Sequence, residues 1–315
     1  MSNIVITGIN SFIGVHLAKY FSSNKYNVIG TISRDISQYE GIKKVRIVEA
    51  LNSSAKIEKL DITQPDELIN IISKTKPDYW IHHAGWATDY GSFEYDFPRG
   101  FGVNVKPLST LYPALKNCGC KGIIITGSSA EYGDGNQADK ETDAAFPTMP
   151  YGLSKLTETL YAQQLANKYN LPTRVARVYI PFGTLDAPNK LIPSAINHIK
   201  KNESIDLSTC EQKRDFIYVN DLVKGYEALL NDLNRGSIFD IFNICSGNAT
   251  KLKDLLLMKA SELGSSHDLL KFGARQMRAG EALVSHGSNK KAMRILGWKP
   301  GNLNEGIREY LGKCS

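Results

Sequence analysis

The 315-residue sequence predicts an α/β fold in which helices cover both faces of a doubly wound parallel sheet. Three observations predict it. Short β-branched runs alternate with helical segments over the first 180 residues, as in a sheet built from strand–helix–strand units. A glycine-rich turn joins the first of these runs to the first helical segment. Beyond residue 180 prolines cluster and the segments shorten, which indicates a smaller C-terminal lobe.

The first elements are predicted from composition and spacing. Asn3–Thr7 and Asn27–Ile32 are strand-like runs, and Lys56–Ile62 is a third. The apolar residues of Phe12–Phe21 recur with helical spacing. Gln64-Pro65 opens a further helix to about Lys74, because proline suits the first turn of a helix.

The following elements continue the alternation. Tyr79–His83 is a strand between a proline and a glycine, and Asn104–Lys116 is a helix with an internal proline. Gly122–Thr126 is a fully apolar strand. A long helix follows Met149-Pro150, and Thr173–Val178 is the next strand.

These elements divide the chain unequally. We expect residues 1–180 to form the main α/β domain and residues 181–315 to form mostly a second lobe. Phe239–Ile244 is strand-like and could return to the main sheet, so the second lobe is not expected to be continuous in sequence.

Composition excludes several classes of protein. The net charge is only +6 and the basic residues are dispersed, so nucleic-acid binding is not indicated. No apolar run approaches the ~18 residues that a membrane span needs, and the N-terminus lacks the basic region of a secretory signal. The five cysteines include one Cys118-Gly119-Cys120 pair without a second pair, so no metal site is expected. We expect a reduced, cytoplasmic protein.

The first motif lies in the turn after the first strand. Gly8 allows the tight turn and Gly14 lets the helix pack close to the sheet. The free N–H groups and positive dipole end of a helix N-terminus can receive a pyrophosphate. Ser11 stands where a middle glycine is usual, and its hydroxyl could donate to a phosphate. The residues expected to bind a dinucleotide here are Gly8, Asn10, Ser11, Phe12, Ile13 and Gly14.

The second motif combines a serine, a tyrosine and a lysine. Tyr151 and Lys155 are four residues apart, so they share a helix face. An ammonium beside a phenol lowers the pKa of the tyrosine and creates an acid/base group. Tyr39/Lys43 and Tyr112/Lys116 have the same spacing, but only Tyr151 opens the helix that follows a strand ending near Ser128. In proteins with an open parallel sheet, ligands bind beyond the carboxyl ends of the strands, which is where Ser128 is expected to lie.

Together these motifs resemble the extended short-chain dehydrogenase/reductases, in particular the NAD-dependent epimerase/dehydratase family that acts on nucleotide sugars. The resemblance runs in order along nearly the whole chain and implies a Rossmann fold with a substrate-binding lobe. The matching segments are Thr7-Gly8, Asp61-Ile62, His83-Ala84-Gly85, Asn104-Val105, 127–133, 214–221, Arg278-Ala279-Gly280-Glu281 and 296–300.

The resemblance implies a role for each segment. Tyr151 is the acid/base, Lys155 holds the nicotinamide ribose, and Ser128 bonds the reacting sugar oxygen. Asp61 and Ile62 hold the adenine, the segment His83, Ala84 and Gly85 lies near the cofactor ribose, and Asn104 supports the active site. Tyr179 and Ile180 lie near the nicotinamide carboxamide. The substrate-binding residues are Ser129, Lys190 and Arg214, with Arg214 on the diphosphate; its alternative is a surface ion pair with Asp215 or Glu211.

Departures from the family pattern narrow the reaction. The acid of sugar 4,6-dehydratases is replaced by Ala130, and Glu131 is expected to point to another face. The Cys and His of 3,5-epimerase/4-reductases are replaced by Ala130 and Phe182. Arg177 stands where the family usually has an asparagine, which argues against a standard UDP-galactose 4-epimerase.

The favoured function is therefore an NADPH-dependent reductase of a nucleoside-diphosphate 4-keto-6-deoxyhexose, acting in deoxysugar nucleotide biosynthesis. A nucleotide-sugar 4-epimerase is the alternative, and a non-catalytic NAD(P)-sensing protein is a remote one. Ser33-Arg34 ends the second strand without an acid, so we expect NADP(H) rather than NAD(H), with Asp35 facing elsewhere. Leucines of two helices (Leu108, Leu111, Leu115, Leu156, Leu160 and Leu165) predict a homodimer.

Overall fold

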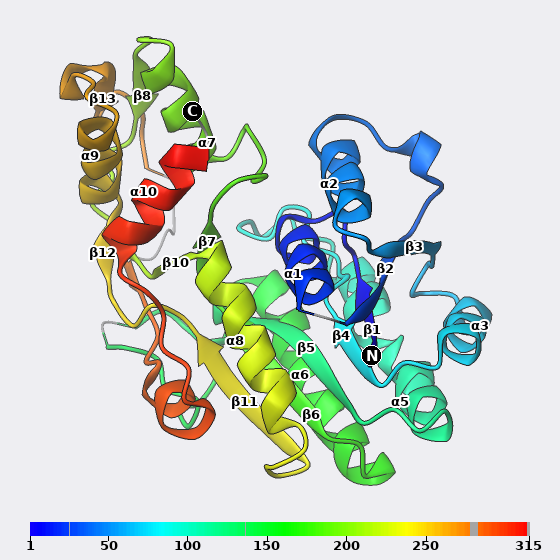
Figure 1. The fold of residues 1–315 in the computed structure, drawn as a ribbon. Coiled ribbons are helices and arrows are strands. Elements are labelled where there is room, and N and C mark those ends of the chain that lie inside the picture. The colour runs from blue at the N-terminus through cyan, green and yellow to red at the C-terminus, as the bar shows by residue number, and fades with distance from the viewer. Residues whose placement is uncertain (25, 136, 278–282, 314–315) are drawn as a thin grey trace.

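A computed structural model describes residues 1–24, 26–135, 137–277 and 283–313. Its centre is a seven-stranded sheet in the order β11-β6-β5-β4-β1-β2-β3, and every pairing in it is parallel. Figure 1 shows this sheet crossing the lower part of the molecule. The strands are β1 (Asn3–Thr7), β2 (Asn27–Ile32), β3 (Lys56–Lys59), β4 (Tyr79–His82), β5 (Gly122–Ser128), β6 (Thr173–Val178) and β11 (Phe239–Ile244).

Helices cover both faces of the sheet and enclose two apolar cores. On one face α1 (Phe12–Ser23) packs against α2 (Gly41–Asn52) and α8 (Val219–Asp232). On the other, α5 (Leu108–Asn117) packs against α3 (Pro65–Thr75) and α6 (Pro150–Tyr169). Strands buried from both sides can be apolar throughout, which is why β5 begins with the run Gly-Ile-Ile-Ile. The predicted α/β class is confirmed.

The C-terminal part builds a smaller lobe at the carboxyl edge of the sheet, at the upper left of Figure 1. Its three small sheets pair β10 with β7, β13 with β8, and β9 with β12 and β14. Their strands are β7 (Ile180–Phe182), β8 (Ile205–Leu207), β9 (Lys213–Arg214), β10 (Phe216–Tyr218), β12 (Thr250–Lys251), β13 (Leu270–Phe272) and β14 (Val284–Ser285). Its helices are α7 (Leu191–Lys200), α9 (Leu252–Glu262) and α10 (Leu303–Lys313).

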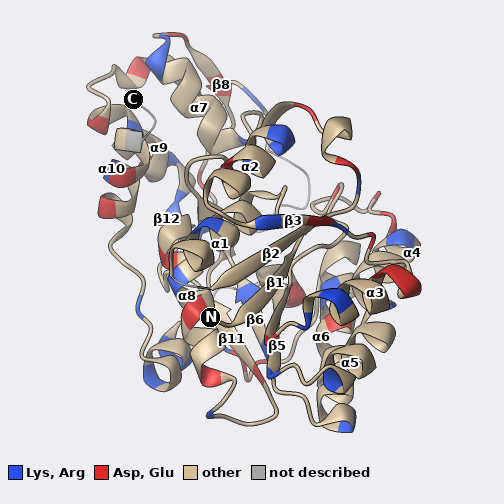
Figure 2. Cartoon of the chain, turned by 45° about the vertical axis from the view of Figure 1, so that its right-hand side comes forward, with Lys and Arg blue, Asp and Glu red and all other residues tan. Residues whose placement is uncertain are grey.

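β11 returns from this region to pair with β6, as the composition of Phe239–Ile244 suggests. The division of the chain at residue 180 stays a prediction. No helix within the described residues is long and apolar enough to cross a membrane. In Figure 2 the Lys and Arg residues (blue) and the Asp and Glu residues (red) are scattered over the helices, strands and loops, in agreement with the dispersed charge of the sequence.

Two predicted elements differ from the observed ones by more than two residues at one end. The third strand ends at Lys59 rather than Ile62, because Asp61 turns the chain and accepts the N–H of Gln64. The expected helix Asn104–Lys116 is broken at Pro107, which has no N–H to donate. Before Pro107 the chain forms α4 (Phe97–Gly100) and a π-helical turn over Phe101–Val105, and after Pro107 it forms α5, which begins at Leu108.

Candidate active site

The glycine-rich loop has the geometry that a pyrophosphate needs. Gly8 has a φ of 73°, and a Cβ on Gly14 would lie 2.3 Å from the Gly8 carbonyl oxygen. Ser11 caps α1, since its Oγ accepts the N–H of Gly14. The N–H groups of Phe12 and Ile13 belong to the first turn, where a helix has no internal acceptors. The residues present therefore fit the pyrophosphate of a dinucleotide.

A chain of hydrogen bonds ties this loop to the ends of β4 and β5. Ser11 Oγ is 2.8 Å from His83 Nε2, and His83 Nδ1 is 3.0 Å from Thr126 Oγ1. Thr126 continues the chain to the hydroxyl of Tyr226. Burial lowers the pKa of His83 to about 3, so the imidazole is neutral. Ser11, which was expected to face a phosphate, thus has its hydroxyl engaged with His83 and the helix end.

Tyr151, Lys155 and Glu158 form a stripe along one face of α6. The Lys155 ammonium forms an ion pair with the Glu158 carboxylate, and their side chains are 9% and 1% exposed. The pKa of Tyr151 is raised rather than lowered. Burial is the larger effect, although the charge of Lys155 and a hydrogen bond with Ser128 both act to lower that pKa. Lys155 therefore acts in the expected direction, but burial outweighs it and the net shift of the Tyr151 pKa is upward.

Ser128 ends β5 and caps the short turn that follows, where its Oγ accepts the N–H of Ala130. The Glu131 carboxylate is fully buried behind this turn. It accepts from the N–H of Ser128, from Thr159 and from Arg177. Glu131 thus points away from the reacting groups, as predicted, and Ala130 contributes no acid.

Asn104 connects the segment after β4 to α6. Its Oδ1 accepts the N–H of Trp86 at 2.7 Å, and its Nδ2 donates to Ser154 Oγ at 2.9 Å. The neighbouring Tyr95 is buried, donates to the Trp86 carbonyl and sets its ring edge-on to Tyr151. The asparagine therefore supports the helix that carries Tyr151.

The adenosine end of the expected cofactor site lies beyond β2 and β3. Ser33 and Arg34 are exposed at the end of β2. The Asp35 carboxylate is 3.4 Å from the Lys59 ammonium, so it faces β3. Asp61 accepts from both the N–H and the hydroxyl of Thr63, while Ile62 is buried.

The predicted substrate residues lie on the smaller lobe and its junction. Lys190 precedes α7, pairs with Asp186 at 3.0 Å and lies 5.8 Å from the centre of the Phe12 ring. Arg214 lies in β9. Its alternative partners are held elsewhere: Asp215 accepts from Ser246 and Gly247, and Glu211 pairs with Lys251. The segment Arg278–Glu281 lies outside the described residues.

Tyr179, Ser129 and Ile180 were also expected at the site. Tyr179 is 4% exposed and donates its hydroxyl to Asp139 at 2.9 Å. Ser129 opens the turn after β5, with its carbonyl accepting the N–H of Tyr132, and the Ile180 side chain is 37% exposed on β7. The tyrosine hydroxyl is therefore committed to Asp139, and the cofactor contacts of the pair stay predictions.

Three residues near Tyr151 were not predicted from the sequence, namely Glu158, Tyr90 and Tyr95. Glu158 follows Lys155 at a spacing of three, which is a visible signal, but solvent-facing helices show the same spacing. Tyr95 reaches Tyr151 from a loop, so no periodicity could reveal it.

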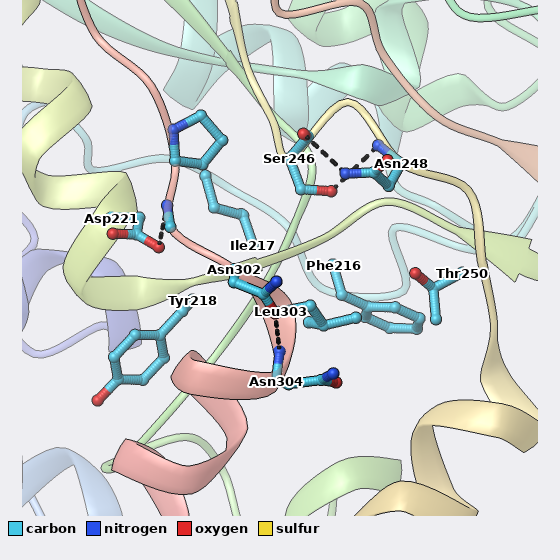
Figure 3. Close-up of a pocket in the computed structure, with 12 residues that line it drawn as sticks. Phe216, Ile217, Tyr218, Asp221, Ser246, Asn248, Thr250, Asn302, Leu303 and Asn304 are labelled. Atoms are coloured by element: carbon cyan, nitrogen blue, oxygen red, sulfur yellow. Dashed lines mark hydrogen bonds between the residues drawn. The ribbon is translucent and has the colours of Figure 1, made fainter.

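Figure 3 shows a separate cavity of about 330 Å³ between β10, the 246–250 segment and the start of α10. Several of its polar groups bond to one another or to nearby backbone, as in Asp221 with the N–H of Gly301 and Asn248 with Ser246. None of the residues predicted for the site is among those that line it. We assign it no ligand.

Comparisons with known proteins agree with this geometry. The model of the NAD dependent epimerase/dehydratase family matches residues 4–245. The chain is 27% identical to the CDP-abequose synthase of Salmonella typhimurium, over 98% of this chain and 97% of that one. It is 30% identical to the dTDP-4-dehydro-6-deoxyglucose reductase of Escherichia coli, over 66% of each chain.

A solved structure extends the likeness to the whole fold. The UDP-glucose 4-epimerase of Thermotoga maritima, solved with UDP-glucose, is 26% identical and superposes with a TM-score of 0.85 over 99% of both chains. The glycine-rich loop, the Ser128, Tyr151 and Lys155 set and the C-terminal lobe follow one another in the order that the sequence resemblance predicts. The chain belongs to the NAD-dependent epimerase/dehydratase family, and it is an NAD(P)-dependent enzyme of nucleotide-sugar chemistry.

Proposed function

We propose that the protein is an NADPH-dependent reductase of a nucleoside-diphosphate 4-keto-6-deoxyhexose. One observation favours this reaction over the other reactions of the family. The carboxylate next to the turn after β5, Glu131, is fully buried and bonded to Ser128, Thr159 and Arg177. It is therefore not placed to remove a proton from the sugar or to expel water from C6.

The residues that remain suit a simple hydride transfer at C4. Ala130 and Phe182 carry no acid/base group, and Phe182 is buried beside the rings of Tyr218 and Tyr310. The related Escherichia coli enzyme is named as a reductase of a 4-dehydro-6-deoxy sugar on dTDP. This name supports the proposed class of substrate but does not choose the base of the nucleotide.

The chemistry follows from the positions of the polar groups. A reduced nicotinamide would supply the hydride for C4 of the sugar. Tyr151 would donate its phenolic proton to O4, so that hydride and proton together convert the carbonyl to a hydroxyl, and the Tyr151 phenolate would regain a proton from solvent. Ser128 holds O4 by a hydrogen bond, and Lys155 holds the ribose. Arg214 and Lys190 supply cations for the diphosphate.

The decisive experiment is a screen of 4-keto-6-deoxyhexoses carried on CDP, GDP, dTDP and UDP, followed by the absorbance of NADPH. We expect consumption of one NADPH for each C4 hydroxyl formed. Interconversion of UDP-glucose and UDP-galactose with no net use of cofactor would instead identify a 4-epimerase. The structural likeness to a 4-epimerase makes that the outcome to exclude.

We also propose a cytoplasmic homodimer, which the sequence predicts to pair through α5 and α6 and for which the exposed surface favours α6. Part of the sequence argument for it is wrong. Leu108, Leu111 and Leu115 are fully buried in the core of the single chain, so they cannot form an interface. On α6 the predicted Leu165 is buried as well, at 6% exposed, and Leu156 is half-buried. The support that remains is Leu160, which is 50% exposed, together with Leu153 on the same helix, which was not predicted and is 46% exposed.

A further inference from the structure

Glu158 is a buried carboxylate for which the proposed chemistry has no use. Its side chain is 1% exposed and forms an ion pair with the Lys155 ammonium. Tyr151, Lys155 and Glu158 stand at spacings of four and three on α6, so all three lie on one face of the helix. A buried ion pair costs desolvation, and it does not by itself indicate added stability.

The titratable groups that interact electrostatically with Glu158 lie in four parts of the chain. Lys155 and Tyr151 share its helix, and the charge of Glu131, in the turn after β5, acts on it. The charge of Glu158 also acts on Tyr95 from the loop after β4 and on Tyr112 from α5. Glu131 forms its ion pair with Arg177, and Glu158 forms its ion pair with Lys155. The charge that Glu158 offsets is therefore that of Lys155.

We propose that Glu158 is a positioning residue that holds the Lys155 ammonium and offsets its charge, so that Tyr151 remains a phenol and acts as a general acid. A lysine without this counter-charge would favour the phenolate, the base needed to begin by oxidising a hydroxyl. A reductase needs the opposite, since its first proton goes to the ketone oxygen. The inference rests on the proposed direction of the reaction.

The ionisation of Glu158 agrees with this arrangement. Burial raises the pKa of its carboxyl to about 7, although Lys155 opposes the shift. Glu158 is therefore charged above neutral pH, where Tyr151 titrates. Its negative charge acts to raise the pKa of Tyr151, in the same direction as burial.

The test measures Tyr151 directly and needs no substrate. Protein labelled with ¹³C at the tyrosine ζ-carbon is titrated by NMR without cofactor, and Tyr151→Phe assigns the resonance. We expect the wild-type midpoint to lie above the ordinary value of about 10. In Glu158→Gln the midpoint moves down by about 1–3 pH units, the effect of an uncompensated cation nearby. Glu203→Gln, which removes an exposed carboxylate, leaves it in place.

Either of two results overturns the proposal. One is a Tyr151 midpoint in Glu158→Gln that is unchanged or raised. The other is a wild-type midpoint below 10, which needs no variant and stands even where Glu158→Gln does not fold. A parallel assay of ketone reduction is expected to show the alkaline loss of kcat at lower pH in Glu158→Gln. Absence of all ketone reduction would contradict the proposed function, while the NMR titration still decides the role of Glu158.

Discussion

Glu131 Oε2 accepts a hydrogen bond from Arg177 Nε at 2.9 Å, in a site where the side chains are 0% and 4% exposed. The guanidinium also lies over the ring of Tyr132, 4.3 Å from its centre. Through its other oxygen, Glu131 holds the N–H of Ser128. Arg177, at the position where the family usually has an asparagine, therefore supports the serine turn from behind.

Removal of this arginine should destabilise the whole fold. We expect Arg177→Met to lower the free energy of unfolding by about 3–5 kcal/mol, because it leaves a buried carboxylate without its cation. Arg308→Met is the matched control, since Arg308 pairs with Glu262 at an exposed site and should cost less than about 1 kcal/mol. Urea denaturation measures both. Equal losses in the two variants would contradict the assigned importance of the buried pair.

Tyr151→Phe should remove most turnover and preserve cofactor binding. Loss of the proton donor is expected to lower kcat by about 10²- to 10⁴-fold. The ring contacts with Tyr90 and Tyr95 survive, since phenylalanine keeps the ring. Single-turnover kinetics gives the rate and fluorescence titration gives the NADPH affinity. A kcat equal to that of the wild type would assign the proton donor elsewhere.

The sequence predicted the sheet well because each of its strands carries a local signal. It was weaker where the cause lies in tertiary structure. The helix α2 was not anticipated, since it buries only Arg46, Ile47 and Ala50 and leaves Val45 and Val48 exposed. The leucines of α5 correctly predicted a helix, but they were wrongly expected at a dimer interface and are buried within the single chain. Periodicity locates the apolar face of a helix but does not show what that face packs against.

The same distinction applies to the candidate site. The glycine turn and the Tyr151/Lys155 spacing are local features, and the structure places them beside the ends of β1 and β5. The pKa of Tyr151 depends on burial, which spacing does not reveal. The contact between Tyr95 and Tyr151 depends on how the 85–96 loop folds back through Asn104.

Asp139 should make stability depend on pH. Burial raises the pKa of its carboxyl from 3.8 to about 6. An acid whose folded pKa is raised contributes stability below pH 4, and that contribution is lost as the pH rises through 6. Asp139→Asn should therefore stabilise the protein at pH 8 by up to about 3 kcal/mol and have little effect near pH 4. Thermal unfolding at both pH values measures this, with Asp206→Asn as the control, because Asp206 is exposed and does not act on Asp139. A gain independent of pH would contradict the role of Asp139.

The assembly can be tested at the exposed leucines of α6. We expect the wild type to be a dimer by light scattering at micromolar concentration. The double substitution Leu153→Lys and Leu160→Lys should give a monomer, because it places cations in an apolar contact. Val45→Lys with Val48→Lys, an equally exposed pair on α2, should leave the dimer intact. A monomeric wild type would refute the proposed interface.

Arg34 is expected to select NADP(H). It follows β2, where an NAD-binding site usually has an acid for the ribose 2′-hydroxyl. The carboxylate that follows it in sequence, Asp35, faces Lys59. A guanidinium there offers a charged, planar set of donors to a 2′-phosphate. A hydrogen bond to a charged group contributes about 1.5–3 kcal/mol, so Arg34→Ala should lower kcat/KM for NADPH by about 10- to 100-fold. The value for NADH should change little, because that cofactor lacks the phosphate.

The control is Arg235→Ala, which removes an exposed arginine after α8. Equal use of both cofactors by the wild type, or a ratio unchanged by Arg34→Ala, would show that Arg34 does not recognise the phosphate. The proposed reductase would then lose the support that a preference for NADPH gives it.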